Sequence, residues 1–597
     1  MSYSAASLRW AAEQADQFFA RRKYVPALEE IAEVQRQTAA RPVDPFMPDR
    51  AICELAERRA VLMSERINGL TEPMTPERMR EWLSEQVEAM NARPLPEFKC
   101  GKAFAEQLAP MLKRVQCRLY WRRQLRRAVV LAREALAMQR GEVCARRRQV
   151  YITDDTARRH GERAAANAAM LEATELEDAT GQVITLAQAS AATTASPAIR
   201  RGELMTRVRG CEEWADAAGL VGLFTTNTTP SRYHPQRMTG GANPRHDGST
   251  PRQAQEWLRK TWAKARSALQ RKGVDFFGFR VAEPHHDGCP HWHMLLWTKP
   301  GHLSELRDTM RAYWLKDAGE EPGAQEYRFH AEDMKRGGAT GYIAKYITKG
   351  IDDVGALEAE GHTDQRAGEQ AELFGAGANR VRAWASAHGI RQFQAIGQPP
   401  VTVWRELRRI TDEAAAGASD AIKAARVAVH RDGERRADWR AYMDAQGGAM
   451  KGRANRIRLV VDTTEREGRY GPAEGQRPIG VEDARRPGEW VLSDRREWRP
   501  KGTWSEEARA PRRRLVGLLV PVAPRAAGAP WTRLNNCTQG RGARDLIAGL
   551  MARDPSNHEW AGGPQQEIPS WTPPPPPPSA RPRPSPTMLR SFWKTVV

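Results

Sequence analysis

The segment 285–297 constrains the fold more than any other part of this 597-residue chain. It reads HHDGCPHWHMLLW, so that His291 and His293 are separated by one bulky apolar residue and followed by an apolar run. This pattern is typical of a β-strand, and alternate side chains of a strand point to the same face of a sheet. We therefore expect both imidazoles to project from one rigid surface, where they would form half of a metal site.

The residues around this strand predict a mixed fold. Strands are predicted at 220–227, 274–283, 290–297 and 326–332, where apolar and β-branched residues lie between turn residues. Helices are predicted at 302–317 and at 337–349. A third helix is predicted to begin at Pro251, where Thr250 supplies the cap, and to end at Gly273. This order predicts the α+β class, with a central antiparallel sheet flanked by helices.

Composition divides the chain into five parts. Residues 1–205 predict a helical, basic N-terminal region, and residues 206–350 carry the mixed strands and helices. Residues 351–380 read as a polar linker, and residues 381–465 predict a mainly helical extension of the core with one strand-like piece. Residues 466–597 are rich in Arg, Gly and Pro, include six consecutive prolines, and predict a largely disordered tail.

One stretch of the N-terminal region, residues 121–140, predicts an amphipathic helix. Its apolar residues recur at three- and four-residue spacing: Trp121, Leu125, Val129, Ala132 and Leu136. Arginines decorate its other faces: Arg122, Arg123, Arg126, Arg127 and Arg133. These arginines form either a solvated basic face or a surface that follows DNA.

The charge and the cysteine content narrow the class of protein. A formal net charge of +20 and a pI near 9.9 point to a polyanionic partner, although binding to ribosomes or to a membrane surface would fit the charge equally well. The seven cysteines show no CxxC pair, so we expect reduced thiols in a cytosolic compartment. With no signal-peptide pattern and no apolar run of spanning length, we expect a soluble intracellular protein without a membrane partner.

A third metal ligand is predicted from the hairpin that precedes the histidine strand. The candidates are Glu283, His285, His286 and Asp287. A two-residue turn would place Glu283 opposite Trp292, on the face away from both histidines. A three-residue loop, 286–288, suits Gly288 because its last position needs a positive φ, and it places Glu283 opposite His291. We therefore predict Glu283 as the third ligand, above an apolar floor of Phe277, Phe279 and Val281.

Two imidazoles and one carboxylate, with open positions, suit Mg²⁺ or Mn²⁺ acting as a Lewis acid on a phosphate group. The same three side chains would also hold Zn²⁺, or iron as in oxygenases. Since a lone pair of histidines in a basic protein is more often structural than catalytic, the catalytic interpretation also depends on two tyrosines.

Tyr342 and Tyr346 stand four residues apart in the predicted helix 337–349 and share one helical face. The alternative is an ordinary amphipathic helix whose tyrosines pack at the edge of the core. Lys345 and Lys349 repeat the spacing and would hold a phosphate group. A phenol, with a pKa near about 10, becomes a nucleophile when cations such as the metal and Lys345 lower that pKa. Its attack on phosphorus would give a 5′-phosphotyrosine and a free 3′-OH that reverses the step without ATP.

These residues resemble the HUH endonuclease superfamily, and within it the phage replication gene A protein family of the P2-like type. The similarity is carried by residues 281–296 (VAEPHHDGCPHWHMLL), 341–349 (GYIAKYITK), 383–393 and 401–409, and extends over roughly residues 110–450. Residues 225–234 (TTNTTPSRYH) match the first family motif, although Asn227 and Thr229 vary from its usual pattern. This motif and the tyrosine helix supply the predicted DNA-binding residues, which are Thr226, Arg232, Lys345 and Lys349.

The resemblance implies a ferredoxin- or RRM-like HUH nuclease domain at 206–350 and a metal-dependent enzyme of rolling-circle replication. In that family a site-specific nick at a phage origin in single-stranded DNA is followed by priming and rejoining. The resemblance assigns His291 and His293 to the metal and Tyr342 and Tyr346 to the attack on DNA. Because the chain has no GxxxxGK[ST] phosphate loop, a host helicase is the expected partner, in the cytoplasm of a bacterium that carries the phage or prophage.

Three other functions fit the same residues. A relaxase or transposase of the same superfamily would use this site to move DNA between replicons. A DNA-binding or packaging protein would keep its function without either tyrosine, because its histidines would hold a structural metal. A metal-dependent hydrolase that uses water would leave no covalent bond between protein and DNA.

Overall fold

The computed structural model describes most of the chain between residues 43 and 502. The described residues are 43–70, 74–90, 92–93, 95–98, 104–144, 149–237, 240–334, 338, 340–341, 343, 347, 380–433 and 435–502. They contain helices and antiparallel strands in about the order that the sequence predicts. The α+β fold class is therefore confirmed.

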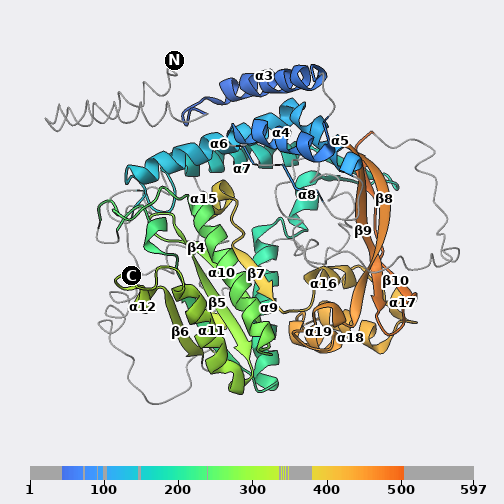
Figure 1. The fold of residues 1–597 in the computed structure, drawn as a ribbon. Helices are drawn as coiled ribbons and strands as arrows, with labels where there is room; N and C mark the ends of the chain where they lie inside the picture. Colours follow the sequence, from blue (N-terminus) through green and yellow to red (C-terminus); the bar gives the residue numbers. More distant parts are fainter. Residues whose placement is uncertain are drawn as a thin grey trace.

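A five-stranded antiparallel sheet, formed by strands from residues 221–396, lies at the centre of this part of the chain (Figure 1). Its strand order is β6-β3-β5-β4-β7. The strands are β3 (Val221–Asn227), β4 (Phe276–Pro284), β5 (Pro290–Thr298), β6 (Phe329–Met334) and β7 (Phe393–Ile396). The edge strand β7 comes from the predicted helical extension, so the extension and the core share one sheet.

Helices α10 (Pro251–Arg271) and α11 (Leu303–Leu315) cover one face of this sheet. Helix α10 begins and ends as predicted: Thr250 and Gln253 form a capping box, and Gly273 follows the helix with a φ of +69°. Leu258 of α10 and Met310 of α11 are fully buried in a core with Leu296 of β5. Because side chains alternate along a strand, burial of the apolar side chains of β5 on this face leaves the others on the opposite face of the sheet.

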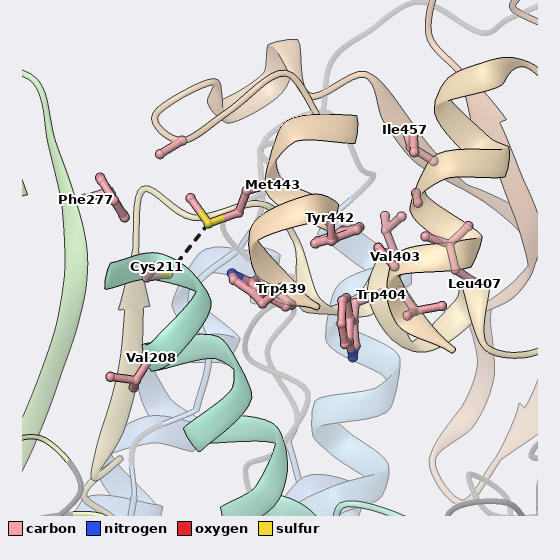
Figure 2. Close-up of a cluster of buried hydrophobic side chains, with 14 of the residues drawn as sticks. Val208, Cys211, Phe277, Val403, Trp404, Leu407, Trp439, Tyr442, Met443 and Ile457 are labelled. Carbon is pink, nitrogen blue, oxygen red and sulfur yellow. Dashed lines mark hydrogen bonds between the residues drawn. The ribbon is translucent and has the colours of Figure 1, made fainter. Parts of the chain in front are cut away.

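The opposite face packs against α9 (Pro197–Ala217) and a helical module from the C-terminal part of the chain. Figure 2 shows Val208 and Cys211 of α9 near residues of helix α19 (Trp439–Ala445), with Trp404 of helix α16 (Val401–Leu407) on the side of Trp439 away from α9. The approach is close: a Cβ added at Gly210 would lie 2.6 Å from the Cβ of Trp439. Segments more than two hundred residues apart thus form one core, because Cys211 Sγ lies 3.8 Å from Met443 Sδ.

The remaining helices form the N-terminal layer, the connections and the helical module that packs against α9. They are α3 (Asp49–Asn68), α4 (Pro76–Glu88), α5 (Phe104–Val115), α6 (Arg118–Gln139), α7 (Asp154–Ala173), α8 (Leu186–Ala191), α12 (Ala324–Tyr327), α15 (Arg380–His388), α16 (Val401–Leu407), α17 (Asp412–Ala415), α18 (Asp420–Val429) and α19 (Trp439–Ala445). Among the described residues, no helix is both long and apolar enough to cross a membrane.

Helix α6 has the predicted buried stripe, since Trp121, Leu125 and Leu136 are at most 1% exposed and Val129 and Ala132 are also buried. Arg133 differs from the prediction that the arginines decorate open faces. It is 6% exposed and forms a 2.6 Å ion pair with Asp155 of α7. A buried arginine needs such a partner because removing its charge from water is costly.

Strands also occur where the sequence predicts a helical region and a disordered tail. They are β1 (Glu175–Asp178), β2 (Val183–Thr185), β8 (Ile457–Gly468), β9 (Gly471–Asp483), β10 (Trp490–Leu492) and β11 (Trp498–Pro500). Strand β11 pairs with β1, and Trp498 is buried against Leu176. The prediction of a disordered tail is therefore wrong for residues 466–502. The prediction rested on the high average content of Arg, Gly and Pro, which hides the buried apolar residues at strand spacing. Residues 503–597 lie outside the described residues.

Candidate metal centre

The β4–β5 hairpin sets the geometry of the site. Its two strands pair so that Glu283 lies opposite His291 and Val281 opposite His293. The loop has three residues, since the His285 N–H donates to the Cys289 carbonyl at 2.7 Å, and Gly288 has a φ of +81°. The predicted register and loop are both confirmed.

The side chains of Glu283, His291 and His293 converge on one point of this face. One ligand atom from each lies within 4.8 Å of the other two. The Nε2 atoms of the two histidines are 2.9 Å apart, and His293 Nε2 lies 3.9 Å from Glu283 Oε2. Neighbouring ligands of an octahedral ion with bonds of about 2.1 Å are roughly 3 Å apart. The donors present, two imidazoles and a carboxylate, therefore fit a divalent cation.

The apolar floor beneath these three residues is as predicted. Phe277, Phe279 and Val281 are each at most 3% exposed and belong to the core that α9 closes. Glu283 and His293 are themselves 3% and 7% exposed, whereas His291 is half-buried. A carboxylate held in such surroundings favours a nearby cation, because its negative charge has lost most of its contact with water.

Thr226 of β3 lies beside the histidine pair and is opposite His293 in the sheet. Its hydroxyl is 3.2 Å from His293 Nδ1. If Nδ1 carries the proton and donates to this hydroxyl, Nε2 keeps its lone pair for a metal. The structure therefore gives Thr226 a role in orienting the imidazole, and its predicted contact with DNA stays a prediction.

Arg232, the other DNA-binding residue expected from the first motif, is held by a carboxylate. Its Nη1 and Nη2 atoms donate to Asp317 at 3.0 and 2.7 Å, and its guanidinium lies 4.8 Å from the ring of Tyr233. The hydrogen bond to Asp317 raises the pKa of Arg232. These contacts secure the short helix that follows β3, and the predicted contact with DNA is again untested.

The tyrosine helix is described at only a few positions, and Tyr342, Lys345, Tyr346 and Lys349 lie outside them. Ile343 and Ile347, which the sequence places on an adjoining face, are helical and 1% exposed. They belong to the same core as Phe224 and Leu295 of the site face. The N–H of Thr340, at the start of this helix, donates to Glu212 of α9 at 3.0 Å.

A buried hydrogen-bond network below the hairpin loop was not predicted. Asp287, considered above as a ligand, instead lies 3.0 Å from His234 Nδ1 and accepts from the Cys289 N–H. The hydroxyl of Thr229 lies 3.3 Å from His234 Nε2 and 3.2 Å from Cys289 Sγ. The alternation of side chains along a strand cannot predict such a network, because His234 and Asp287 come from separate loops.

The charged groups of this network shift one another's pKa. Burial would lower the pKa of His234, but the neighbouring Cys289 and Asp287 outweigh it and raise that pKa well above its usual value. Burial would raise the pKa of Asp287, but His234 lowers it well below the usual range. His285, whose ring centroid is 4.0 Å from that of His291, has a lowered pKa because of burial and of the neighbouring His291. The charged pair formed by His234 and Asp287 thus holds the loop beside the candidate metal ligands.

A second histidine–carboxylate pair lies on strand β6 of the same sheet. His330 is opposite Thr226, and its Nε2 is 2.9 Å from Glu332 Oε1. His330 and Glu332 are both partly exposed and lie outside the group of residues that could hold a metal. They give a control site for tests of the metal centre.

Comparison with known proteins identifies relatives over most of the chain. The model of the family described as "Bacteriophage replication gene A protein (GPA)" matches residues 51–354, more than half of the chain. The chain is 38% identical to the replication gene A protein of Escherichia phage 186, over 73% of this chain and 61% of that protein. It is 34% identical to the replication gene A protein of Escherichia phage P2, over 66% and 52%.

A third relative is named "Probable replication endonuclease from prophage-like region" in Salmonella paratyphi A, and is 30% identical over 72% of this chain and 53% of that protein. The aligned part of this chain thus spans between about half and three fifths of the length of these curated relatives. No solved structure matches this chain.

Replacing Thr226 by Val removes the hydroxyl beside His293 Nδ1 and keeps the shape of the side chain. We expect the affinity for Mn²⁺ to fall by about tenfold, as when other outer-shell partners of metal ligands are lost. Titration calorimetry of the full chain measures this. Thr228→Val is the matched control, because Thr228 donates to the Tyr327 carbonyl and not to a histidine. Equal affinities of the two variants would show that Thr226 does not orient His293.

Replacing Asp287 by Asn breaks the buried pair with His234, and we expect a loss of about 3 kcal/mol in the free energy of unfolding near pH 6. Because the pKa of His234 is raised in the folded state, the pair stabilises the fold fully below the pKa of the unfolded histidine, about 6.5. This stabilisation is lost as the pH rises through the pKa of the folded-state histidine. The lowered pKa of Asp287 means that the contribution is also lost as the pH falls through the folded-state value.

Urea denaturation without metal, repeated at rising pH, measures this difference between Asp287→Asn and wild type. The exposed Asp308→Asn serves as control. A deficit of Asp287→Asn that stays constant as the pH rises would contradict a charged pair.

Proposed function

Because this chain belongs to the bacteriophage replication gene A protein family, we propose that it is a DNA endonuclease that nicks one strand at a phage replication origin and later rejoins it. The observation that carries the proposal is the convergence of Glu283, His291 and His293 on one face of the sheet. The name of the Salmonella relative, a probable replication endonuclease, supports the same activity. A net charge of +20 suits a polyanionic substrate.

The three converging side chains would hold Mg²⁺ or Mn²⁺. When bound there, the cation would supply Lewis-acid polarisation of the scissile phosphate. Glu283 and His293 are buried and fixed by strand pairing, so the site needs little rearrangement to bind an ion. Thr226 would hold the His293 ring in the orientation that presents Nε2.

Tyr342 and Tyr346 are the proposed nucleophiles. The phenol would give up its proton and its oxygen would form a bond to phosphorus while the bond from phosphorus to the 3′ oxygen breaks, and the leaving 3′ oxygen would take up a proton. The product is a 5′-phosphotyrosine that a 3′-OH can later attack, which rejoins the strand without ATP. Burial of Ile343 and Ile347 in the core of the site face supports placement of this helix against the sheet.

A host helicase is the proposed partner, since the chain has no GxxxxGK[ST] phosphate loop for ATP. The alternatives differ in what they leave on the DNA. A relaxase or transposase would form the same adduct at another DNA sequence, a hydrolase would cut without an adduct, and a DNA-binding protein with a structural metal would do neither. The relatives' names favour replication over the first alternative.

The nicking reaction can be tested with single-stranded DNA that spans this gene and its neighbours, incubated with Mg²⁺ or Mn²⁺. We expect a protein–DNA adduct that survives denaturant, and its loss in the double variant Tyr342→Phe plus Tyr346→Phe. Tyr327→Phe is the matched control, because Tyr327 is 39% exposed on another helix. Cleavage without an adduct would replace this proposal by hydrolysis with water, and sequencing of the cut locates the origin.

Metal binding can be tested separately from catalysis. In His291→Ala and Glu283→Gln we expect the affinity for Mn²⁺ to fall by at least about a hundredfold, because each change removes a direct ligand, which costs more than the roughly 10–100-fold loss seen for outer-shell partners. Titration calorimetry measures the affinity. His330→Ala should bind like wild type, since His330 lies on the same face outside the triad. An equal loss in His330→Ala would place the ion elsewhere on this face.

A further inference from the structure

We infer that four arginines from separate parts of the fold form a binding site for the backbone phosphates of single-stranded DNA. They are Arg93, which follows α4, Arg123 and Arg127 on α6, and Arg252 in the first turn of α10. The inference rests on the proposed function only for the identity of the anion. The arrangement of the arginines themselves is a property of the fold.

Two of the guanidinium groups meet at the end of helix α15. A Cβ added at Gly389 would lie 2.9 Å from both Arg127 Nη2 and Arg252 Nη1. Gly389 is exposed and has a φ of +64°, and Nη1 of Arg252 donates to its carbonyl at 3.3 Å and to that of His388 at 3.1 Å. A residue without a Cβ therefore lets two cations approach the same exposed point of the chain.

Arg93 and Arg123 extend this group toward solvent. The backbone N–H of Arg93 donates to Gln124 Oε1 at 3.3 Å, which holds the segment after α4 on the surface of α6. Arg123 and Arg127 are four residues apart and share one face of that helix. Both Arg93 and Arg123 are exposed, so the group is open to a ligand from solvent.

The like charges in this cluster lower one another's pKa. Burial lowers the pKa of Arg127 to about 10, and the charges of Arg252, Arg93 and Arg123 add to this effect. In the part of the chain that the structure describes, Arg127 forms no ion pair with a carboxylate. Other arginines of the same two helices do form one: Arg118 with Glu57 at 2.9 Å, and Arg259 with Glu256 at 2.5 Å. An anion would relieve the repulsion within the cluster.

The cluster lies near the β4–β5 hairpin that carries the candidate metal ligands, on the face of the sheet that α10 covers. Gln255, one helical turn after Arg252, accepts from the indole N–H of Trp292 at 2.9 Å, and Trp292 separates the two histidines of the triad. Trp384 of α15 donates to the Gly288 carbonyl of the hairpin loop at 2.8 Å. Both helices at the cluster are therefore tied to the β4–β5 hairpin, on the side of the sheet opposite to the triad. Guanidinium groups suit phosphate because they can donate two parallel hydrogen bonds.

The test compares two double variants with the same change in net charge. Arg127→Gln plus Arg252→Gln removes the cluster, and Arg118→Gln plus Arg259→Gln removes arginines that already have acidic partners on the same helices. Binding of the full chain to a fluorescent single-stranded oligonucleotide is measured by anisotropy in EDTA at several salt concentrations. For the cluster variant we expect an affinity that is at least about tenfold weaker. The slope of the logarithm of the affinity against the logarithm of the salt concentration should be shallower by about 1 to 2, since each lost phosphate contact removes about 0.7. The control should match wild type.

Two further variants keep the result interpretable. Arg127→Lys plus Arg252→Lys retains the charge but loses the paired hydrogen bonds, so its affinity should lie between those of wild type and of the Gln variant. Arg93→Gln plus Arg123→Gln changes exposed side chains and should weaken binding even if the first variant fails to fold. Wild-type affinity in either Gln variant, once folding is confirmed by circular dichroism, would overturn the inference.

Inorganic phosphate serves as a second probe. One outcome is that phosphate raises the melting temperature of wild type and not that of the cluster variant while both bind DNA equally well. That result would assign the site to a free anion and overturn its assignment to DNA. Because binding is measured without metal and with an arbitrary sequence, failure to nick does not affect the test. If wild type binds no single-stranded DNA, the proposed function fails as well, whereas equal binding by wild type and variant contradicts only the cluster.

Discussion

The pairing of β4 with β5 is the constraint on which the site depends. A shift of one residue in this register would turn His291 and His293 away from Glu283, because side chains alternate between the faces of a sheet. The register is held at the loop, where a Cβ on Gly288 would lie 2.5 Å from Met138 Cε and 2.8 Å from the Tyr151 carbonyl. Since Met138 and Tyr151 belong to the N-terminal part of the chain, that part packs directly against the loop that positions the candidate metal ligands.

Much of this centre could be predicted because the signals are local. The strand period of two, the need for glycine at the third loop position and the capping box of α10 each occupy only a few consecutive residues. They sufficed to select Glu283 from four candidate ligands and to place an apolar floor beneath it. The metal and the tyrosine chemistry stay predictions, and Tyr342 and Tyr346 lie outside the described residues.

What the sequence could not predict depends on contacts between distant segments. Asp287 lies near the triad in sequence, yet it pairs with His234 from another loop. Arg133 looks like a surface residue in a basic helix, but Asp155 allows its burial. The Arg127–Arg252 cluster and the β1–β11 pair likewise join segments whose proximity appears only in the folded chain. Periodicity reports which face of an element is apolar, and it carries no information about the partner of a charged side chain.

The pairing of β1 with β11 has a consequence for the order in which the protein is made. Lys501 donates its N–H to the Glu175 carbonyl, and its ammonium group binds the Glu175 carboxylate at 2.8 Å, across 326 positions of the chain. During synthesis the first helices leave the ribosome long before their last partner strand exists. One edge of strand β1 therefore stays without its partner until residue 500 has been translated, and only then can β11 form hydrogen bonds with it.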